Sequence, residues 1–257
     1  MLSIDQISKT YNAGSVNESA VFDHFSLQVP TGEFVSIVGS NGSGKTTILN
    51  LICGSIPLDQ GHIGLDGRDI TKMKEYQRSS FIGRVFQDPA KGTCPSMSIL
   101  ENLAIADNKE KSYGLKPGIN KRRIDLYRTL LEPLHLGLED KLMTPVGSLS
   151  GGQRQALALV MSTLPHIQLL ILDEHTAALD PRVSETIMTL TDQLVRQKKL
   201  TTLMVTHNLK FAVQYGDRLI MMHEGRSIID RSGPEKSAMQ ITDLLETFNT
   251  ISIECGN

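Results

Sequence analysis

Apolar positions in the N-terminal third of the chain follow the patterns of β-strands. Phe25, Leu27 and Val29 alternate with polar residues, and this period of two predicts a strand with one buried face. After a Pro-Thr-Gly turn, residues 34–38 (Phe-Val-Ser-Ile-Val) form a short, mostly apolar run that is typical of a strand buried on both faces. The next segment, 45–54, is predicted to be a helix that ends in a C-capping glycine.

The middle of the chain has a different character. Between residues 88 and 148, prolines and glycines interrupt the chain repeatedly, and two segments have a helical pattern. We interpret about 88–164 as a helical subdomain inserted into a core that is formed by about 1–87 and 165–232. The remaining residues, about 233–257, are expected to be a short C-terminal tail with one short helix.

The C-terminal half contains a strand–helix–strand unit. An apolar run at 169–172 is followed by a helix over about 182–198 and then by a strand at 202–206. A unit of this length is a βαβ crossover, so we expect a core sheet that is at least partly parallel. A hairpin with its turn at Glu224-Gly225 is predicted after it.

Composition narrows the classes of function. The formal net charge of −2, from 26 Lys+Arg and 28 Asp+Glu, argues against a broadly basic nucleic-acid surface. Three scattered cysteines without a CxxC pair exclude a disulfide framework and a zinc ribbon, and they fit a reducing compartment. We read no signal peptide at the start and no run near the ~18 apolar residues of a membrane helix. A cytoplasmic chain is therefore expected.

A glycine-rich phosphate loop lies between the predicted strand at 34–38 and the predicted helix at 45–54. The eight residues Gly39-Ser40-Asn41-Gly42-Ser43-Gly44-Lys45-Thr46 match G-x-x-x-x-G-K-[ST] at every fixed position. Thr47 follows them and is also expected to contact the nucleotide. The glycines let backbone N–H groups turn toward phosphate oxygens, and the helix N-terminus adds positive potential. Lys45 can reach the β- and γ-phosphates, and the Thr46 hydroxyl can ligate Mg²⁺. The flanking elements favour nucleoside triphosphate binding over a plain Gly-Ser loop that only caps a helix.

Two carboxylates follow a buried strand. Asp173 and Glu174 come directly after the apolar run at 169–172, and a strand delivers them at its C-terminal edge, where ligands of open α/β sheets bind. We expect Asp173 to hold Mg²⁺ through water and Glu174 to polarise the water that attacks the γ-phosphate. The alternative is a strand that ends in ordinary solvated acids.

A third motif, Leu149-Ser150-Gly151-Gly152-Gln153, indicates the family. Ser followed by two glycines at the start of a helix forms a second anion-binding turn. One chain needs only one γ-phosphate cradle, so the second implies a nucleotide held by another molecule. With these motifs in this order to about residue 230, the sequence resembles the ATP-binding-cassette ATPases. The resemblance implies an α/β P-loop NTPase fold, with a mixed parallel core sheet, an antiparallel N-terminal β-subdomain and an inserted helical subdomain.

In that family the nucleotide lies between two cassettes. The resemblance implies that Ser150, Gly151, Gly152 and Gln153 contact the γ-phosphate bound by Lys45 of a partner chain. Ala-Leu-Asp at 178–180 matches the loop that crosses the dimer interface. From the residues alone, Asp180 can equally be the cap of a helix that starts at the following proline.

Three further residues take their roles from the same resemblance. Tyr11 matches the aromatic residue that stacks on adenine, whereas a lone tyrosine after a strand otherwise indicates surface packing. Gln87, in Val-Phe-Gln-Asp, matches the glutamine that senses Mg²⁺ and the attacking water at the hinge into the helical subdomain. His207, after Val-Thr, matches the switch histidine that contacts the γ-phosphate and Glu174. An idle loop glutamine and an ordinary histidine at a strand end are the alternatives.

Two of the positions that depart from the family pattern lie just after Glu174. His175 follows Glu174 where proline is common, which introduces a titratable group next to the expected base. Ala177 stands where a serine usually precedes Ala-Leu-Asp. Neither change removes a group that the chemistry needs. A basic cluster at 116–128 is interpreted as a solvated helix face, with contact to anionic lipid headgroups as the alternative.

The resemblance implies an ATPase whose cassettes, as a homodimer or a mixed pair, close on two ATP and open after hydrolysis. Without a membrane segment, the chain is expected to be the separate ATPase subunit, bound to integral-membrane permease subunits on the inner face of the cell membrane. The sequences at 173–181, 206–208 and 221–225 resemble those of importer cassettes for amino acids that work beside a binding lipoprotein. An exporter ATPase and a soluble cassette protein of translation or DNA repair are the alternatives. The interpretation of the chain as a kinase or GTPase would leave the 149–153 motif and His207 without a function.

Overall fold

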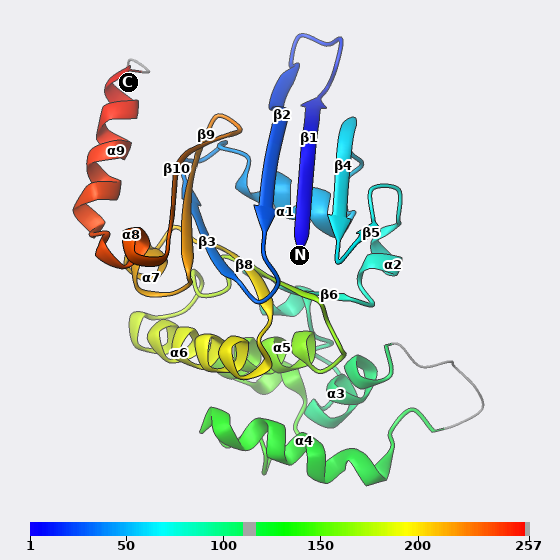
Figure 1. Cartoon of the computed structure of the whole chain (residues 1–257). Helices are drawn as coiled ribbons and strands as arrows, with labels where there is room; N and C mark the ends of the chain where they lie inside the picture. The colour runs from blue at the N-terminus through cyan, green and yellow to red at the C-terminus, as the bar shows by residue number, and fades with distance from the viewer. Residues whose placement is uncertain (110–116, 255–257) are drawn as a thin grey trace. The chain divides into compact units, whose positions relative to one another are not determined.

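The computed structural model describes residues 1–109 and 117–254, and the chain forms two compact units. The first unit comprises Met1–Arg78 and Lys199–Asn257, and the second comprises Ser79–Lys198. Figure 1 shows the strands that dominate the first unit and the helices that dominate the second. The first unit is thus assembled from two segments that are far apart in the sequence.

The N-terminal strands form an antiparallel sheet in the first unit (Figure 1). The sheet has the order β2-β1-β4-β5 and consists of β1 (Leu2–Tyr11), β2 (Ser19–Val29), β4 (Gln60–Leu65) and β5 (Arg68–Asp69). β1 pairs antiparallel with both β2 and β4. The predicted alternation is confirmed, because Phe25, Leu27 and Val29 are buried while their neighbours on β2 are exposed.

A second set of strands in the first unit surrounds β3. The order is β10-β9-β3-β8, with β3 (Phe34–Gly39), β8 (Thr201–Val205), β9 (Arg218–His223) and β10 (Arg226–Ser232). β3 is parallel to β8 and β9, and it is buried at every position, as its apolar run predicts. β9 and β10 form the predicted antiparallel hairpin around Glu224-Gly225. The expectation of a partly parallel sheet is therefore confirmed.

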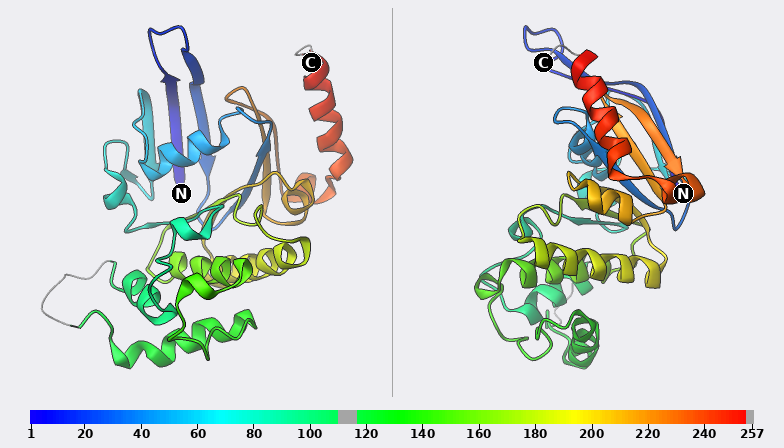
Figure 2. Two further views of the ribbon diagram at one scale, coloured as in Figure 1. Left: turned by 180° about the vertical axis from the view of Figure 1, so that it is seen from behind. Right: turned by 90° about the vertical axis from the view of Figure 1, so that its left-hand side faces the viewer.

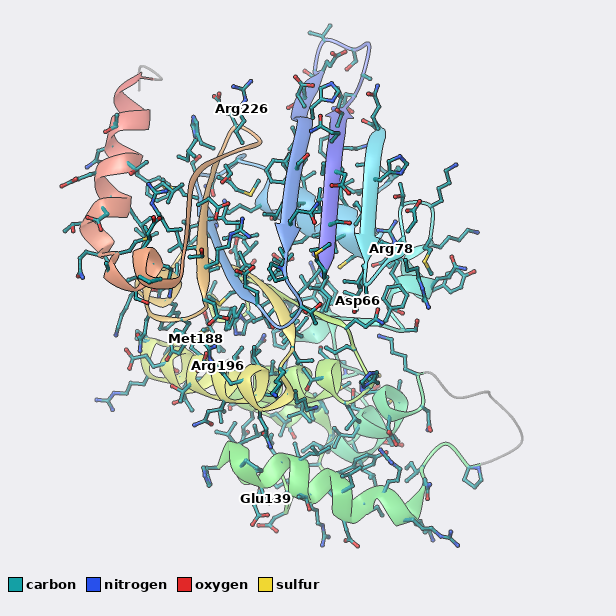
Figure 3. The ribbon with its side chains drawn as sticks, in the orientation of Figure 1. Asp66, Arg78, Glu139, Met188, Arg196 and Arg226 are labelled. Atoms are coloured by element: carbon teal, nitrogen blue, oxygen red, sulfur yellow. The ribbon has the colours of Figure 1, made fainter. Side chains whose placement is uncertain are left out.

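The helix that follows the phosphate loop is fixed at its C-terminal end. α1 (Lys45–Cys53) ends at Gly54, which has the left-handed conformation that was predicted for the C-cap. Arg78, labelled in Figure 3, is the last residue of α2 (Glu75–Arg78) and is 3% exposed. Its Nη1 donates to the carbonyl oxygens of Leu51 and Ile52 at 2.6 and 2.9 Å. A cation at the C-terminus of a helix satisfies carbonyls that have no intrahelical partner and complements the helix dipole.

The tail of the first unit contains two helices, where one short helix was predicted. α8 (Gly233–Ala238) precedes α9 (Ile241–Glu254), and Figure 2 shows α9 beside the strands of the same unit. The prediction of a single helix was wrong because Gly233-Pro234 starts the additional helix α8. Proline is tolerated there, since it lies in the first turn of a helix. Leu244 of α9 is buried in a cluster with Val38 and residues of α7 (Leu209–Gln214) and β9.

The second unit is mainly helical. A parallel pair, β6 (Ile82–Val85) and β7 (Leu169–Asp173), accompanies α3 (Ile99–Asp107), α4 (Ile124–Leu131), α5 (Gly151–Thr163) and α6 (Pro181–Lys198). Short 3-10 helices cover Pro89–Lys91, Lys121–Arg123, Glu132–Leu134 and Val146–Ser148. One apolar cluster joins all four α-helices. The buried stripes of these helices pack together with apolar residues of the segment between α4 and α5, such as Leu138 and Leu142.

A polar contact also joins α3 to α4. The hydroxyl of Tyr127 donates to Oδ2 of Asp107 at 2.9 Å, and the guanidinium of Arg123 pairs with the same carboxylate. Arg123, part of the predicted basic cluster, is therefore engaged within the fold and is not simply solvated. Lys116 of that cluster lies outside the described residues.

Candidate functional site

The phosphate loop joins β3 to α1, and close contacts require two of its glycines. A Cβ added at Gly39 would lie 2.2 Å from the backbone oxygen of Met222 on β9, and φ at Gly39 is 155°. At Gly44, where φ is 99°, a Cβ would lie 2.8 Å from the ring of Phe22 on β2. Such distances do not occur between real atoms, so both positions need glycine. The loop is thus held between two strands of the first unit.

The inside of the loop is built for an anion. Gly44 caps α1 without a side-chain hydrogen bond, and the first turn has no acidic residue. The first intrahelical bond runs from Ile48 N–H to the Gly44 carbonyl at 2.8 Å, so the N–H groups of residues 45–47 precede it. The ammonium of Lys45, a residue only 5% exposed, donates to the carbonyl oxygens of Gly39 and Ser40 at 2.8 and 2.7 Å. A buried ammonium beside a helix N-terminus fits a polyphosphate.

The register of two parallel strands places His207 next to the start of this loop. Ile37 on β3 lies opposite Val205 on β8, and Thr206 N–H donates to the Ile37 carbonyl at 3.1 Å. Gly39 is the last residue of β3, and His207 lies two residues after the end of β8. His207 is exposed. Because β3 and β8 are parallel neighbours, His207 and the phosphate loop follow strand ends at the same edge of the sheet in the first unit. A contact of His207 with the γ-phosphate stays a prediction.

Tyr11 stands at the end of β1 in the same unit and is half-buried. The ammonium of Lys9 lies 5.6 Å from the centroid of its ring, a cation–π distance. Asp59 holds this strand end, because its carboxylate accepts from Lys9 Nζ and from the Thr10 N–H at 2.7 Å each. Lys9 also lies opposite Phe22, which touches Gly44 of the phosphate loop. Tyr11 is thus connected to the loop through paired strands.

The two predicted carboxylates end β7 in the second unit. The four apolar residues before Asp173 are buried, as predicted. Oδ2 of Asp173 accepts from Nη2 of Arg84 at 2.6 Å. Glu174 is half-buried and has φ 49°, a left-handed conformation that is uncommon for a residue with a side chain and that clusters at functional sites.

His175 is part of the packing behind these carboxylates. It is 2% exposed, and burial lowers the pKa of its imidazole from 6.5 to about 4. Its Nε2 lies 3.2 Å from the hydroxyl of Thr191, and that hydroxyl donates to the Ile187 carbonyl at 2.7 Å. The imidazole Nε2–H must therefore donate to Thr191. His175 is a neutral donor that ties β7 to α6, and its charge near Glu174 is absent at neutral pH.

The signature motif forms a capping box. The Ser150 hydroxyl accepts from Gln153 N–H at 3.2 Å, and the Gln153 carbonyl Oε1 accepts from Ser150 N–H at 3.1 Å. The cap explains why α5 begins at Gly151. It also leaves the N–H groups of Gly151 and Gly152 at the helix start, as an anion-binding turn requires.

The structure brings the signature and Asp180 together within the second unit. A Cβ at Gly152 would lie 2.4 Å from Cγ1 of Val183 on α6, so glycine is required there for close helix packing. Gly151 faces Leu179, the residue before Asp180. Oδ1 of Asp180 accepts from Val183 N–H at 3.1 Å, which confirms that it caps α6. A role of Asp180 in nucleotide binding stays a prediction.

Gln87 follows β6 and is exposed. The carbonyl of Phe86, the residue before it, accepts from Nε2 of Gln155 on α5 at 3.1 Å, which fixes the start of this loop. Asp88 caps the 3-10 helix that comes next, since its Oδ1 accepts from Ala90 N–H at 2.9 Å. Gln87 is therefore presented between two anchored residues.

The sequence patterns missed Arg84, the partner of Asp173. The signal that could have found it is a charged residue in an otherwise apolar strand, Phe-Ile-Gly-Arg-Val-Phe. The site residues divide between the units: Tyr11, the phosphate loop and His207 lie in the first, and the carboxylates, Gln87, the signature and Asp180 lie in the second.

The residues predicted to hold Mg²⁺ fit that ion. Thr46 offers a hydroxyl, Asp173 a carboxylate and Gln87 an amide oxygen, and Mg²⁺ prefers oxygen ligands. Within residues 1–109 and 117–254, no group of three or more His, Cys, Asp or Glu is arranged to hold a metal. A small set of oxygen donors suits an ion that is held mainly by phosphates and water. Among the helices that the structure describes, none has the length and apolar character needed to cross a membrane.

Comparison with known proteins places these motifs in a family. The profile described as ABC transporter matches residues 22–177. A tyrosine transport ATP-binding protein of Clostridioides difficile is 48% identical over 248 residues, which cover 96% of this chain and 98% of that protein. A thiamine import ATP-binding protein of Histophilus somni is 35% identical over 204 residues, 79% of this chain and 90% of that protein.

Solved structures agree with this assignment. A dimeric ATP-binding cassette in a post-hydrolysis state with ADP and Pi has a TM-score of 0.76 at 27% identity, and the match covers 90% of this chain and 98% of that one. A nucleotide-free cassette of an ABC transporter has a TM-score of 0.80 at 26% identity, over 100% and 99% of the two chains. The predicted α/β cassette fold is confirmed. The chain belongs to the ABC transporter family, as an ATP-binding-cassette ATPase that serves a transporter.

Proposed function

We propose that this ATPase powers a bacterial importer of a small solute such as an amino acid. The observation that carries the proposal is the 48% identity, over nearly the full length of both chains, to a protein named for tyrosine transport. Relatives named for import of thiamine, and of spermidine and putrescine, are only 35% and 32% identical. We therefore base the proposed solute class, an amino acid, on the relative that is named for tyrosine transport.

The geometry supports distinct roles for the residues of the first unit. The N–H groups of residues 39–47 and the Lys45 ammonium bind the triphosphate, and Tyr11 stacks on the adenine ring. His207, beside the start of the loop, contacts the γ-phosphate. A buried ammonium stabilises charge on phosphate oxygens more strongly than an exposed one does, because the local dielectric constant is lower.

The residues of the second unit act on water and on the metal ion. Glu174 accepts a proton from the attacking water, and its left-handed backbone is a strained conformation of the kind found at catalytic positions. Thr46, Asp173 and Gln87 would hold Mg²⁺, which neutralises charge on the phosphate oxygens when it is bound. No residue of the chain forms a covalent bond to phosphate in this scheme.

A second cassette completes the site. Ser150, Gly151, Gly152 and Gln153 of one chain contact the γ-phosphate that is bound by the partner, and Asp180 lies beside them. The pre-formed turn at the start of α5 supports this role, as does the dimeric state of a similar cassette with ADP and Pi. ATP then favours the closed pair, because the bridging contacts exist only in that state.

The proposed partners are integral-membrane permease subunits and a substrate-binding lipoprotein. The chain would lie on the inner face of the cell membrane, with the helical subdomain at about 88–164 transmitting closure to the permease. The names of the relatives, which are ATP-binding proteins of transport systems, support a permease partner.

Affinity purification of the tagged chain from detergent-solubilised native membranes tests the proposal. We expect mass spectrometry to identify a multi-span permease and a binding lipoprotein. The lipoprotein is then screened by thermal shift against tyrosine, other amino acids, thiamine and spermidine, and an amino acid should give the largest shift. A permease without a lipoprotein would favour an exporter, and ribosomal or DNA-repair partners would refute a transport role. A Lys45→Ala chain is the matched control, because its membrane partners should not change.

A further inference from the structure

Arg84 lies in the proposed metal site but belongs to none of the recognised motifs. Its side chain on β6 is 12% exposed, and that of its partner Asp173 is 14% exposed. Nη2 of Arg84 is 2.6 Å from Oδ2 of Asp173. The guanidinium carbon also lies 4.7 Å from the centroid of the Phe86 ring, which is one residue before Gln87. One side chain therefore contacts a proposed Mg²⁺ ligand and the segment that carries another.

The strand register explains how these groups meet. β6 and β7 are parallel, and Arg84 lies opposite Ile171. Side chains two positions apart on a strand share a face. Asp173 therefore follows Ile171 on the same face of β7, and Phe86 follows Arg84 directly after the end of β6. A long arginine side chain bridges this diagonal. The contact is thus a consequence of the backbone and is expected to persist while the two strands remain paired.

The ion pair is largely removed from water, and its partners are well defined. Nε of Arg84 is buried and has no hydrogen-bond partner among the described residues, so the guanidinium is stabilised by the carboxylate and by the aromatic face. The Arg84 carbonyl accepts from the Ser162 hydroxyl at 2.9 Å, which fixes the strand from α5. The hydrogen bond from Arg84 is accepted by Oδ2 of Asp173.

We propose that Arg84 is a positioning residue that serves as the resident counter-cation of Asp173 and competes with Mg²⁺ for its carboxylate. The inference rests on the proposed role of Asp173 as a ligand of Mg²⁺. A guanidinium at this distance holds the carboxylate in place before nucleotide binds and repels the incoming divalent ion. The affinity for Mg²⁺ is therefore kept below the value that Asp173 alone would give.

Equilibrium binding isolates this effect without relying on turnover. The dissociation constant for ATP is measured by calorimetry in excess Mg²⁺ and again in EDTA, in a Glu174→Gln background that prevents hydrolysis. The ratio of the EDTA value to the Mg²⁺ value reports what the protein contributes to binding the ion. Arg84→Gln should raise this ratio by at least about threefold, because a like charge is removed from the site. Arg84→Lys, which keeps the charge, should leave it near the parent value.

A double-mutant cycle with Asp173→Asn provides the control. Asp173→Asn alone should lower the ratio, and Arg84→Gln should have no further effect in that background, where the buried carboxylate is gone. If Arg84→Gln alone fails to fold because it leaves a buried carboxylate unpaired, the double variant avoids that charge. Its ratio is then compared with that of Asp173→Asn, and a difference between the two would overturn the inference. The expected pattern is thus an effect of Arg84→Gln that depends on the presence of Asp173.

Each other outcome is decisive. The inference is overturned if Arg84→Gln changes the two dissociation constants by the same factor, as a purely structural role would, or if Arg84→Lys raises the ratio as much as Arg84→Gln. It is also overturned if Arg84→Gln raises the ratio equally in the Asp173→Asn background. A ratio that Asp173→Asn leaves unchanged would instead remove Asp173 from the Mg²⁺ site, and that result contradicts the proposed function as well.

Discussion

The buried phenol of Tyr127 makes the free energy of unfolding depend on pH in the alkaline range. Tyr127 is 1% exposed, and its hydroxyl donates to Asp107. Burial and the adjacent carboxylate raise the pKa of the phenol from 10.0 to about 12. Between these values the unfolded chain loses a proton that the folded chain keeps. The contribution of the Tyr127 phenol to the free energy of unfolding is therefore fully present below pH 10 and is lost as the pH rises through 12.

The size of the effect follows from the two pKa values. Each pKa unit corresponds to about 1.4 kcal/mol. The free energy of unfolding therefore falls by about 1.4 kcal/mol by pH 11 and by about 3 kcal/mol in the limit of high pH. Tyr127→Phe removes both the titration and the hydrogen bond to a charged group. We expect that variant to be about 2 kcal/mol less stable than the parent at pH 7.5. At pH 11 the difference should shrink to below about 1 kcal/mol.

Urea unfolding followed by circular dichroism, at pH 7.5, 9, 10 and 11, measures this difference directly. Groups other than Tyr127 titrate in both proteins and cancel in the comparison. Tyr76→Phe, a change at a residue 70% exposed, is the matched control and should give no pH-dependent difference. A stability difference between parent and Tyr127→Phe that stays constant from pH 7.5 to 11 would refute the reasoning.

Three further changes test the site. Glu174→Gln should leave ATP affinity within about twofold and lower turnover by about 100-fold or more; hydrolysis at the parent rate would show that Glu174 is not the base. Gly152→Ala should destabilise the fold by about 1–3 kcal/mol in urea, because its Cβ would lie 2.4 Å from Val183, and adding Val183→Ala should restore much of the loss. Asp59→Asn should raise the KM for ATP by about two- to fivefold through Tyr11 with kcat unchanged. An equal loss of affinity for inorganic tripolyphosphate would contradict that route.

Local patterns predicted the elements whose stabilising contacts are nearby in the sequence. The alternation on β2, the run of β3 and the hairpin at Glu224-Gly225 are read from a few adjacent residues, and all three are confirmed. The phosphate loop is equally local, since its glycines, lysine and helix N-terminus are consecutive. The tail shows the limit of such reading, because one short helix was predicted there and Gly233-Pro234 in fact starts an additional helix, α8.

Contacts between distant segments could not be predicted in this way. Arg84 and Asp173 are 89 positions apart, and nothing near either residue indicates the other until the strand register is known. Gly152 illustrates the same point, because the motif predicted an anion-binding turn, while packing against Val183 supplies a second reason for the glycine. The identity of a site residue can be read locally, but its partner depends on the tertiary fold.

If the phosphate loop binds nucleotide as proposed, the hydrogen bonds from Lys45 to two carbonyl oxygens have a consequence for how the nucleotide enters. Because the ammonium already has oxygen partners, the loop keeps a satisfied buried charge and has no electrostatic reason to collapse or unwind when no phosphate is present. Nucleotide entry is then an exchange of one set of oxygen partners for another, in which little chain order has to be created. The recognition step is expected to be rapid and limited by encounter, while the slower events of the cycle are left to the association of two cassettes.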